Sequence, residues 1–134
     1  MTPVGHLLPI TADDCSLLLA ERTIGRVAWA SSQGMVVLPV TYVPTDGLIV
    51  FRVAEDTLPA ELADGHEVAF EVDDIDEETG TGWSVLVRGR ARAHEGRPTE
   101  LPQPWAPGER PVLVAIEPTA VTGRSVSAAW KPRG

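Results

Sequence analysis

The chain has 134 residues and a formal net charge of -8 at pH 7. This length supports one domain with a substantial core and is too short for two ordinary domains, so we expect a single domain over residues 1–134. The acidic balance argues against a general binder of nucleic acid or of anionic membranes, because phosphate groups would be repelled. Cys15 is the only cysteine, which excludes an internal disulfide and a metal site built from several cysteines.

Nothing at the N-terminus has the pattern of a signal peptide, which needs a basic region followed by a long apolar run. No apolar stretch elsewhere is long enough to cross a bilayer as a helix. We therefore expect a cytoplasmic protein.

The first expected element is a short helix over residues 11–25. Thr11 is its expected N-cap, and Asp14 stands three residues later in the capping-box position. Gly25 is expected to end this helix, because glycine commonly follows the last helical turn.

Strand patterns follow, as short runs of β-branched and apolar residues separated by turn signals. The expected strands are residues 25–30, 35–43, 48–52, 66–73, 82–94 and 112–118. Pro39 lies inside the second run and cannot donate to a ladder, so it predicts a sheet edge or a bulge. A second short helix is expected over residues 56–65, and a proline-rich loop over residues 96–111.

The order of these elements predicts the fold class. Consecutive strands joined by tight turns indicate antiparallel pairing. About six strands with two or three short helices predict a mainly β, α+β domain, in which helices plug a compact antiparallel β-barrel.

The strand over residues 82–94 carries three arginines on one face, at alternate positions: Arg88, Arg90 and Arg92. The preceding strand carries three acids on one face: Glu67, Glu71 and Asp73. If the two strands form a hairpin, apolar faces pack together and the acids fall opposite the arginines, in pairs worth roughly 0.2–1 kcal/mol each. The alternative is a binding role for one arginine, and Arg88 is the candidate because it is nearest to Trp83.

Four segments together resemble the pyridoxamine 5'-phosphate oxidase-like flavoproteins, and in particular their short actinobacterial branch. The segments are IGRVAW, LPVTYVPTDGLIVFRV, VAFEVDDIDEETGTGWSVLVRGRAR and PWAPGERPVLVAIEPTAVTGR, which span Ile24 to Arg124. The resemblance implies a split β-barrel that forms a homodimer and binds FMN in grooves at the dimer interface. Related branches use the deazaflavin F420 instead.

The resemblance also implies cofactor-binding residues. Pro39, Val40 and Thr41 would lie along the flavin ring, while Arg52, Val53, Thr57 and the following Leu58 would meet the ribityl chain and the phosphate. Trp83, Ser84 and Val85 would approach from a later strand, and Arg124 from the C-terminal segment. Fixed guanidinium and hydroxyl donors suit a dianionic phosphate, and an apolar wall suits the ring.

The sequence departs from the family pattern at the expected phosphate site. The family has Thr after the arginine and a basic residue after the later Ser or Thr, whereas this chain has Val53 and Leu58 there. Glu55 and Asp56 add negative charge nearby. Losing one charge-assisted hydrogen bond costs roughly 1.5–3 kcal/mol, so FMN affinity is expected to be reduced, and a different cofactor, haem, or no cofactor stays open.

Other residues carry no sharper signal for catalysis or metal binding. Trp29 and Trp105 are expected in packing, and Cys15 as a small buried hydrophobe. The three histidines lack metal-ligand spacing: His6, His66 and His94. No nucleophile-base, phosphate-loop or dinucleotide motif is present, so no catalytic residue is named.

Two functions therefore remain for the structure to test. The first is an FMN-dependent oxidoreductase acting on an unidentified small molecule, with F420 as the alternative cofactor. The second is a non-catalytic split-barrel binding module that has lost FMN.

Overall fold

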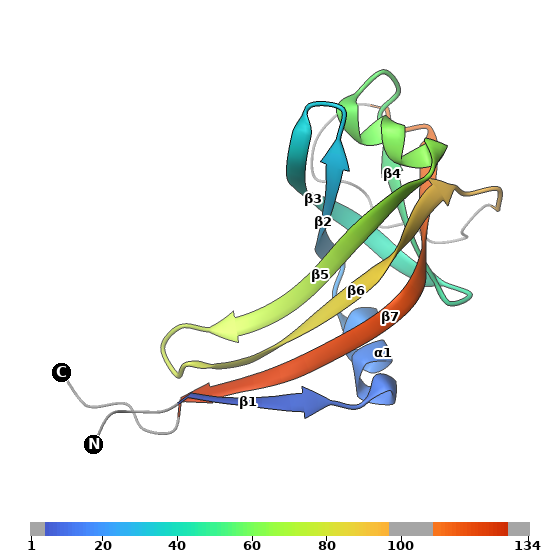
Figure 1. Cartoon of the computed structure of the whole chain (residues 1–134). Coiled ribbons are helices and arrows are strands. Elements are labelled where there is room, and N and C mark those ends of the chain that lie inside the picture. Colours follow the sequence, from blue (N-terminus) through green and yellow to red (C-terminus); the bar gives the residue numbers. More distant parts are fainter. Residues whose placement is uncertain (1–4, 97–108, 129–134) are drawn as a thin grey trace.

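The computed structural model describes residues 5–96 and 109–128, which form one antiparallel sheet of seven strands with two short helices (Figure 1). The elements in chain order are β1 (Gly5–Ile10), α1 (Ala12–Glu21), β2 (Ile24–Ser31), β3 (Gly34–Thr45), β4 (Leu48–Val53), the 3-10 helix η1 (Leu58–Asp64), β5 (His66–Asp76), β6 (Thr81–Ala93) and β7 (Val112–Ala128). The strand order is β1-β7-β4-β3-β2-β5-β6, and β6 also pairs with β7, which closes the sheet into a barrel. This confirms the predicted antiparallel barrel.

Two strand predictions differ from the structure. β1 was not expected at all, because GHLLPI has no alternating pattern and forms its strand only by pairing with the far half of β7. β7 continues to Ala128, well beyond the predicted end at residue 118. Pro118 does not end the strand because it lies at a bulge, where the pairing with β6 shifts between Arg88 and Gly89.

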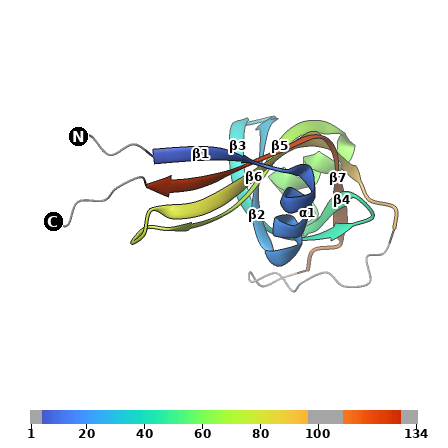
Figure 2. The same ribbon diagram turned by 90° about the horizontal axis from the view of Figure 1, so that it is seen from below.

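The long strands extend beyond the barrel as an arm. β1, the distal half of β7 and the β5–β6 hairpin run together away from the barrel body (Figures 1 and 2). The pairing of Gly82 through Val85 with Gly123 through Val126 continues the sheet into this arm. The domain therefore has a closed body and an open, projecting sheet.

The barrel core is apolar and is closed at its two ends by α1 and η1 (Figure 1). Its largest fully buried side chains are Trp29, Tyr42, Phe51 and Phe70. The rings of Tyr42 and Phe70 pack edge to face, with centroids 4.9 Å apart. Trp29 and Cys15 are buried, as predicted, whereas Trp105 lies outside the described residues.

α1 begins as predicted and ends earlier. The backbone N–H of Asp14 donates to the Thr11 side chain, so Thr11 is the N-cap. The helix stops at Glu21, and the prediction that Gly25 ends it was wrong. Gly25 instead lies inside β2, where a Cβ atom would fall 2.3 Å from the Phe70 ring, so glycine is needed there for packing.

The second short helix is a 3-10 helix held to the barrel by Glu61. One oxygen of this carboxylate accepts from the Trp29 indole at 2.7 Å, and the other accepts from the Ser32 hydroxyl at 2.8 Å. These hydrogen bonds lower the pKa of Glu61. Gly65, with a φ of 96°, ends the helix as predicted.

The predicted matching of acids to arginines across β5 and β6 was wrong for two of three pairs. Glu71 faces Leu86 and Asp73 faces Ser84, while both carboxylates pair with Arg26 of β2, at 3.3 and 3.4 Å. The register depends on the tight turn between the strands, so the acid and arginine patterns do not coincide.

The arginines on β6 have separate surroundings. Arg92 pairs with Glu117 of β7 at 3.7 Å. Arg90 does lie opposite Glu67, but no ion pair joins them among the described residues. Arg88 lies exposed between Ala69 and Ala120.

Candidate functional site

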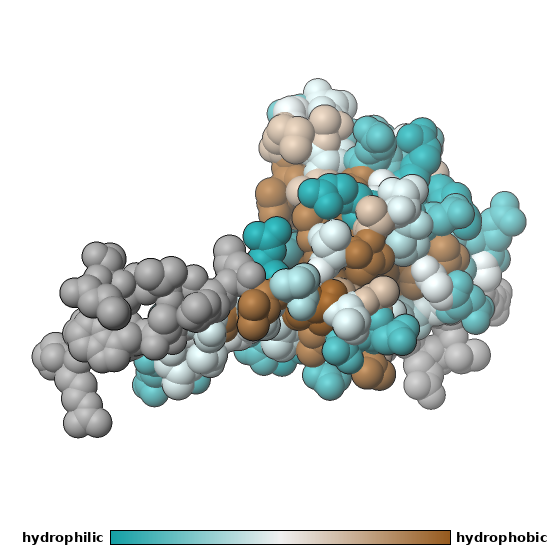
Figure 3. Space-filling view, turned by 60° about the horizontal axis from the view of Figure 1, so that its bottom comes forward, coloured by the Kyte–Doolittle hydropathy of each residue, from teal (hydrophilic) through white to brown (hydrophobic). Residues whose placement is uncertain are grey.

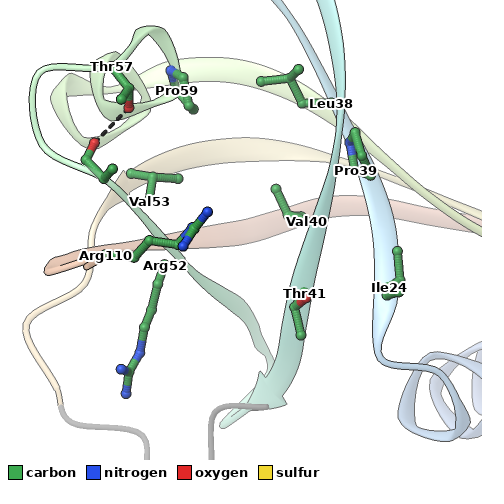
Figure 4. A pocket seen from close by; sticks show the side chains of 11 residues that line it. Ile24, Leu38, Pro39, Val40, Thr41, Arg52, Val53, Thr57, Pro59 and Arg110 are labelled. Atoms are coloured by element: carbon green, nitrogen blue, oxygen red, sulfur yellow. Dashed lines mark hydrogen bonds between the residues drawn. The ribbon is translucent and has the colours of Figure 1, made fainter. Parts of the chain in front are cut away.

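A groove opens where β3 and β4 separate. The two strands pair only from Tyr42 to Thr45 and from Leu48 to Phe51. Among the residues that the structure describes, residues 38–41 of β3 therefore have no strand partner on that side, which makes Pro39 an edge residue, as predicted. The chain after β4 turns towards η1 and forms the opposite side of the groove (Figure 4).

The groove has a volume of about 570 Å³, which is in the range of small-molecule and cofactor sites. Its wall is mainly apolar and is built from Ile24, Leu38, Pro39, Val40, Val53, Ala54 and Pro59. Such a wall can hold a flat ring by excluding water from its faces.

The polar side chains of the groove are two arginines and two threonines: Thr41, Arg52, Thr57 and Arg110. Arg110 extends across the groove towards Val40, and Arg52 extends along another side of the opening (Figure 4). No carboxylate lies among the lining residues that the structure describes. The groove is therefore locally basic on a chain whose net charge is -8.

The hydroxyl of Thr57 already has an acceptor. It donates to the backbone carbonyl of Ala54 at 2.6 Å, which closes the turn before η1 (Figure 4). Thr57 is the N-cap of η1 by position, but its side chain makes no cap hydrogen bond. To donate to a ligand, the hydroxyl would have to give up the bond to Ala54.

Six of the expected cofactor residues lie together in this groove: Pro39, Val40, Thr41, Arg52, Val53 and Thr57. Leu58 does not line it, because its half-buried side chain packs against the barrel core. Glu55 and Asp56 are exposed and also lie outside the lining. They stand between the lining residues Ala54 and Thr57, so solvent weakens their repulsion of a bound anion without removing it.

The other expected residues lie outside the groove of this chain. Ser84 pairs across the sheet with Arg124 on the projecting arm, and Trp83 pairs with Ser125. Val85 is fully buried in the core, and Arg88 is exposed on the outer face of β6.

Sequence reasoning missed five lining residues: Ile24, Leu38, Ala54, Pro59 and Arg110. Ile24 and Leu38 were hidden within apolar strand patterns. Arg110 stood in the proline-rich stretch, far from Arg52 in sequence, and no local signal connects them. The pairing of β4 with β7 brings the two segments together.

Among the described residues, neither Cys15 nor the potential metal-ligand side chains indicate a catalytic site. Burial, and secondarily Asp14, raise the pKa of the Cys15 thiol, which disfavours the reactive thiolate. Within residues 5–96 and 109–128, no group of three or more potential ligand side chains is arranged to hold a metal ion. None of the helices in these ranges is long and apolar enough to span a membrane.

Comparison with protein families matches residues 11–125 to the family described as Pyridoxamine 5'-phosphate oxidase. The chain belongs to this family. A protein of similar sequence from Mycobacterium tuberculosis, the uncharacterized protein Rv0080, is 30% identical over 128 residues, which cover 88% of this chain and 84% of that protein.

This member of the pyridoxamine 5'-phosphate oxidase family is also similar to solved structures. The FAD binding protein from Mycobacterium smegmatis has a TM-score of 0.70 and 30% identity, over 90% of this chain and 98% of that chain. An FAD and haem binding protein from the same organism has a TM-score of 0.67 at 14% identity, over 92% of this chain and 75% of that chain. The second similarity concerns the fold alone, which is the predicted split barrel.

Proposed function

We propose that this protein is a flavin-dependent oxidoreductase that reduces or oxidises a small molecule at the β3–β4 groove. The observation that carries the proposal is the combination of an apolar wall with two arginines in one groove of about 570 Å³. Family membership and the 30% identical FAD binding protein support a flavin as the ligand. The groove suits both FMN and F420, since each joins a flat ring to a phosphate-bearing tail.

The residues of the groove fit the parts of such a cofactor. Leu38, Pro39 and Val40 would pack against the ring, and the unpaired backbone groups of this β3 segment would hydrogen bond to its polar edge. Arg52 would hold the anionic tail. When bound, the flavin supplies the electron transfer, so the protein needs only to orient the ring and keep bulk water from one face.

A homodimer is part of this proposal. On the outer face of the sheet, Met35 and Val37 are 75% and 62% exposed, and Val37 pairs with Ala28 of β2. This apolar face on the barrel would be covered by a second copy. The partner's arm would then supply Trp83, Ser84 and Arg124, which the groove of a single chain does not include.

A non-catalytic binding module is the second candidate. Two observations favour it: Leu58 packs in the core where the family has a basic residue, and the Thr57 hydroxyl is bonded to Ala54. Both weaken the expected phosphate cradle. In this case the groove would bind a ligand without transferring electrons.

The first experiment is a visible absorption spectrum of the purified protein, followed by titration with FMN and with F420. A co-purifying flavin band or saturable binding, together with reduction of the bound cofactor by a chemical donor and reoxidation by an acceptor, is expected. A colourless protein that binds neither cofactor would overturn the oxidoreductase proposal. A haem absorption band would show that the protein binds haem, either in the groove or at another surface.

A further inference from the structure

We propose that Arg110 is the second phosphate-binding residue of the groove, and that it replaces the basic residue that this chain lacks after Thr57. Arg52 and Arg110 would together hold the phosphate ester of an aromatic ligand. The inference rests on the proposed function, because it concerns the tail of the same ligand. It adds a residue that the sequence did not connect with the site.

The side chain at position 58 packs against the core and does not face the groove. Leu58 begins η1, and its half-buried side chain packs against the barrel interior. A lysine or arginine there would have to leave that packing to reach the groove, or would bury its charge at a cost. In this chain, position 58 therefore supplies no positive charge for an anion.

Arg110 is brought to the groove by the pairing of β4 with β7. Val53 pairs with Val112, and Arg52 pairs with Leu113, so the start of β7 runs beside the end of β4. Arg110 precedes Val112 by two residues and enters the groove from this side. Figure 4 shows its side chain reaching past Val53 towards Val40, while Arg52 leaves β4 in another direction. The two guanidinium groups thus flank one opening, Arg52 from β4 and Arg110 from the segment just before β7.

The charged side chains that line the groove suit an anionic ligand. Arg52 and Arg110 are its charged lining residues within the part of the chain that the structure describes, and both are positive. A planar guanidinium binds phosphate oxygens through paired N–H donors, so two of them match a dianionic phosphate monoester. Thr57 contributes less, because its proton is directed to Ala54. Arg110 thus supplies the positive charge that Leu58 does not provide.

The test compares ligands that differ only in the phosphate. Wild-type protein, Arg110→Ala, Arg110→Lys and Arg52→Ala are titrated with FMN and with riboflavin, which carries the same ring without a phosphate. Arg92→Ala is the matched control, because it removes one exposed arginine that pairs with Glu117 on the outside of the barrel. Thermal unfolding of each variant shows that it is folded.

Arg110→Ala is expected to weaken FMN binding by at least about 10-fold and to change riboflavin binding by less than about 3-fold. Arg110→Lys is expected to retain part of the FMN affinity, and Arg92→Ala all of it. The difference in affinity between FMN and riboflavin for the wild-type protein should also become smaller at high salt, because salt screens an ionic contact with the phosphate. A parallel titration with FAD shows whether the pair prefers a monoester or a diphosphate.

Other outcomes would overturn the inference. Unchanged FMN affinity in Arg110→Ala, or equal weakening of FMN and riboflavin, would show that Arg110 does not contact the phosphate, while the proposed function would stand. If wild type binds only F420, the same comparison is made with its phosphate-free deazaflavin chromophore. A wild-type protein that binds no flavin or deazaflavin would overturn the proposed function and this inference together.

Discussion

Tyr42 joins the first helix to the barrel through a single hydroxyl. Its ring is buried against Phe70, and its hydroxyl donates to the backbone carbonyl of Leu19 at 2.6 Å. Burial raises the pKa of this phenol to about 12, while the charge of Arg22 opposes the shift. Tyr42 therefore packs in the core and also makes a hydrogen bond that holds α1 at one end of the barrel.

Tyr42→Phe is expected to lower the free energy of unfolding at pH 7 by about 1–2 kcal/mol, because the Leu19 carbonyl loses its donor in a buried place. Chemical denaturation measures this loss. In wild type the folded-state pKa of Tyr42 lies above the ordinary value of 10. The contribution of the neutral phenol to the free energy of unfolding is therefore complete below pH 10 and is lost as the pH rises through about 12. The stability gap between wild type and variant should therefore narrow at pH 11, and a constant gap would contradict this assignment.

Glu71 is a second residue whose ionisation matters for stability. Burial raises its pKa to about 7, and the neighbouring Asp73 adds to the shift, while Arg26 at 3.3 Å opposes it. Arg26 also contacts Asp73, so one cation serves two carboxylates. The folded protein therefore holds a proton at this pair more tightly than the unfolded chain does.

Glu71→Gln is expected to stabilise the protein at pH 8 and to have little effect at pH 5. Since the folded-state pKa is above the unfolded value of 4.5, the stabilising contribution of the protonated form is complete below pH 4.5 and is lost as the pH rises through about 7. The side chain is 35% exposed, so we expect a gain of only about 1 kcal/mol or less. Glu67→Gln on the same strand is the control, and equal pH profiles for the two variants would contradict the assignment.

Among the elements, the bulge between β6 and β7 decides how the sheet passes from barrel to arm. Arg88 pairs with Ala120 and Gly89 pairs with Pro118, so Thr119 is the extra residue of β7. The Thr119 hydroxyl donates to the carbonyl of Arg88 at 3.1 Å. A Cβ atom on Gly89 would lie 2.3 Å from the carbonyl oxygen of Glu117, which belongs to the backbone and cannot rotate away.

Gly89→Ala is expected to lower the free energy of unfolding by about 1–3 kcal/mol, because β6 and β7 must move apart at the closure of the barrel. Gly96→Ala is the matched control, since its Cβ would meet only the movable side chain of His94, and its effect should stay within about 0.5 kcal/mol. Urea denaturation of both variants tests this. Equal losses would show that the close approach at Gly89 does not restrain the sheet.

At the scale of the whole molecule, the outer face of β2 and β3 is the surface at which we expect a second copy of the chain to bind. Met35 and Val37 are exposed there beside alanines of β2, and hydrophobic surface also gathers on the barrel body in the face shown in Figure 3. Leu17 on α1 is exposed to the same degree as Val37, at 63% and 62%. The two residues therefore allow a matched comparison.

Val37→Asp is expected to convert a dimer into monomers, or to weaken dimerisation at least about 10-fold, because it places a charge in a proposed apolar interface. Leu17→Asp should leave the dimer intact. Sedimentation velocity over a range of concentrations measures both. A monomeric wild type would contradict the proposed dimer, and a dimer that survives Val37→Asp would move the interface to another face.

The sequence by itself determined the elements whose signals are local. The side chain of Thr11 caps α1, Gly65 ends η1, and Pro39 lies on a sheet edge, because each depends on the conformation or hydrogen bonding of a few adjacent residues. The number and spacing of such strands predicted a mainly β fold, and the resemblance to the family implied the split barrel. Six of the residues that the family resemblance places at the cofactor also line the groove, since they come from β3, from β4 and from the turn that follows β4.

Only the tertiary structure decided the features that depend on distant partners. β1 becomes a strand because β7 pairs with it, and position 25 needs glycine because the Phe70 ring packs over it. Arg110 enters the groove because β4 and β7 are neighbours in the sheet, which no pattern within residues 96–111 indicates. Local sequence sets backbone preferences, whereas the packing of strands far apart in the chain sets which side chains meet.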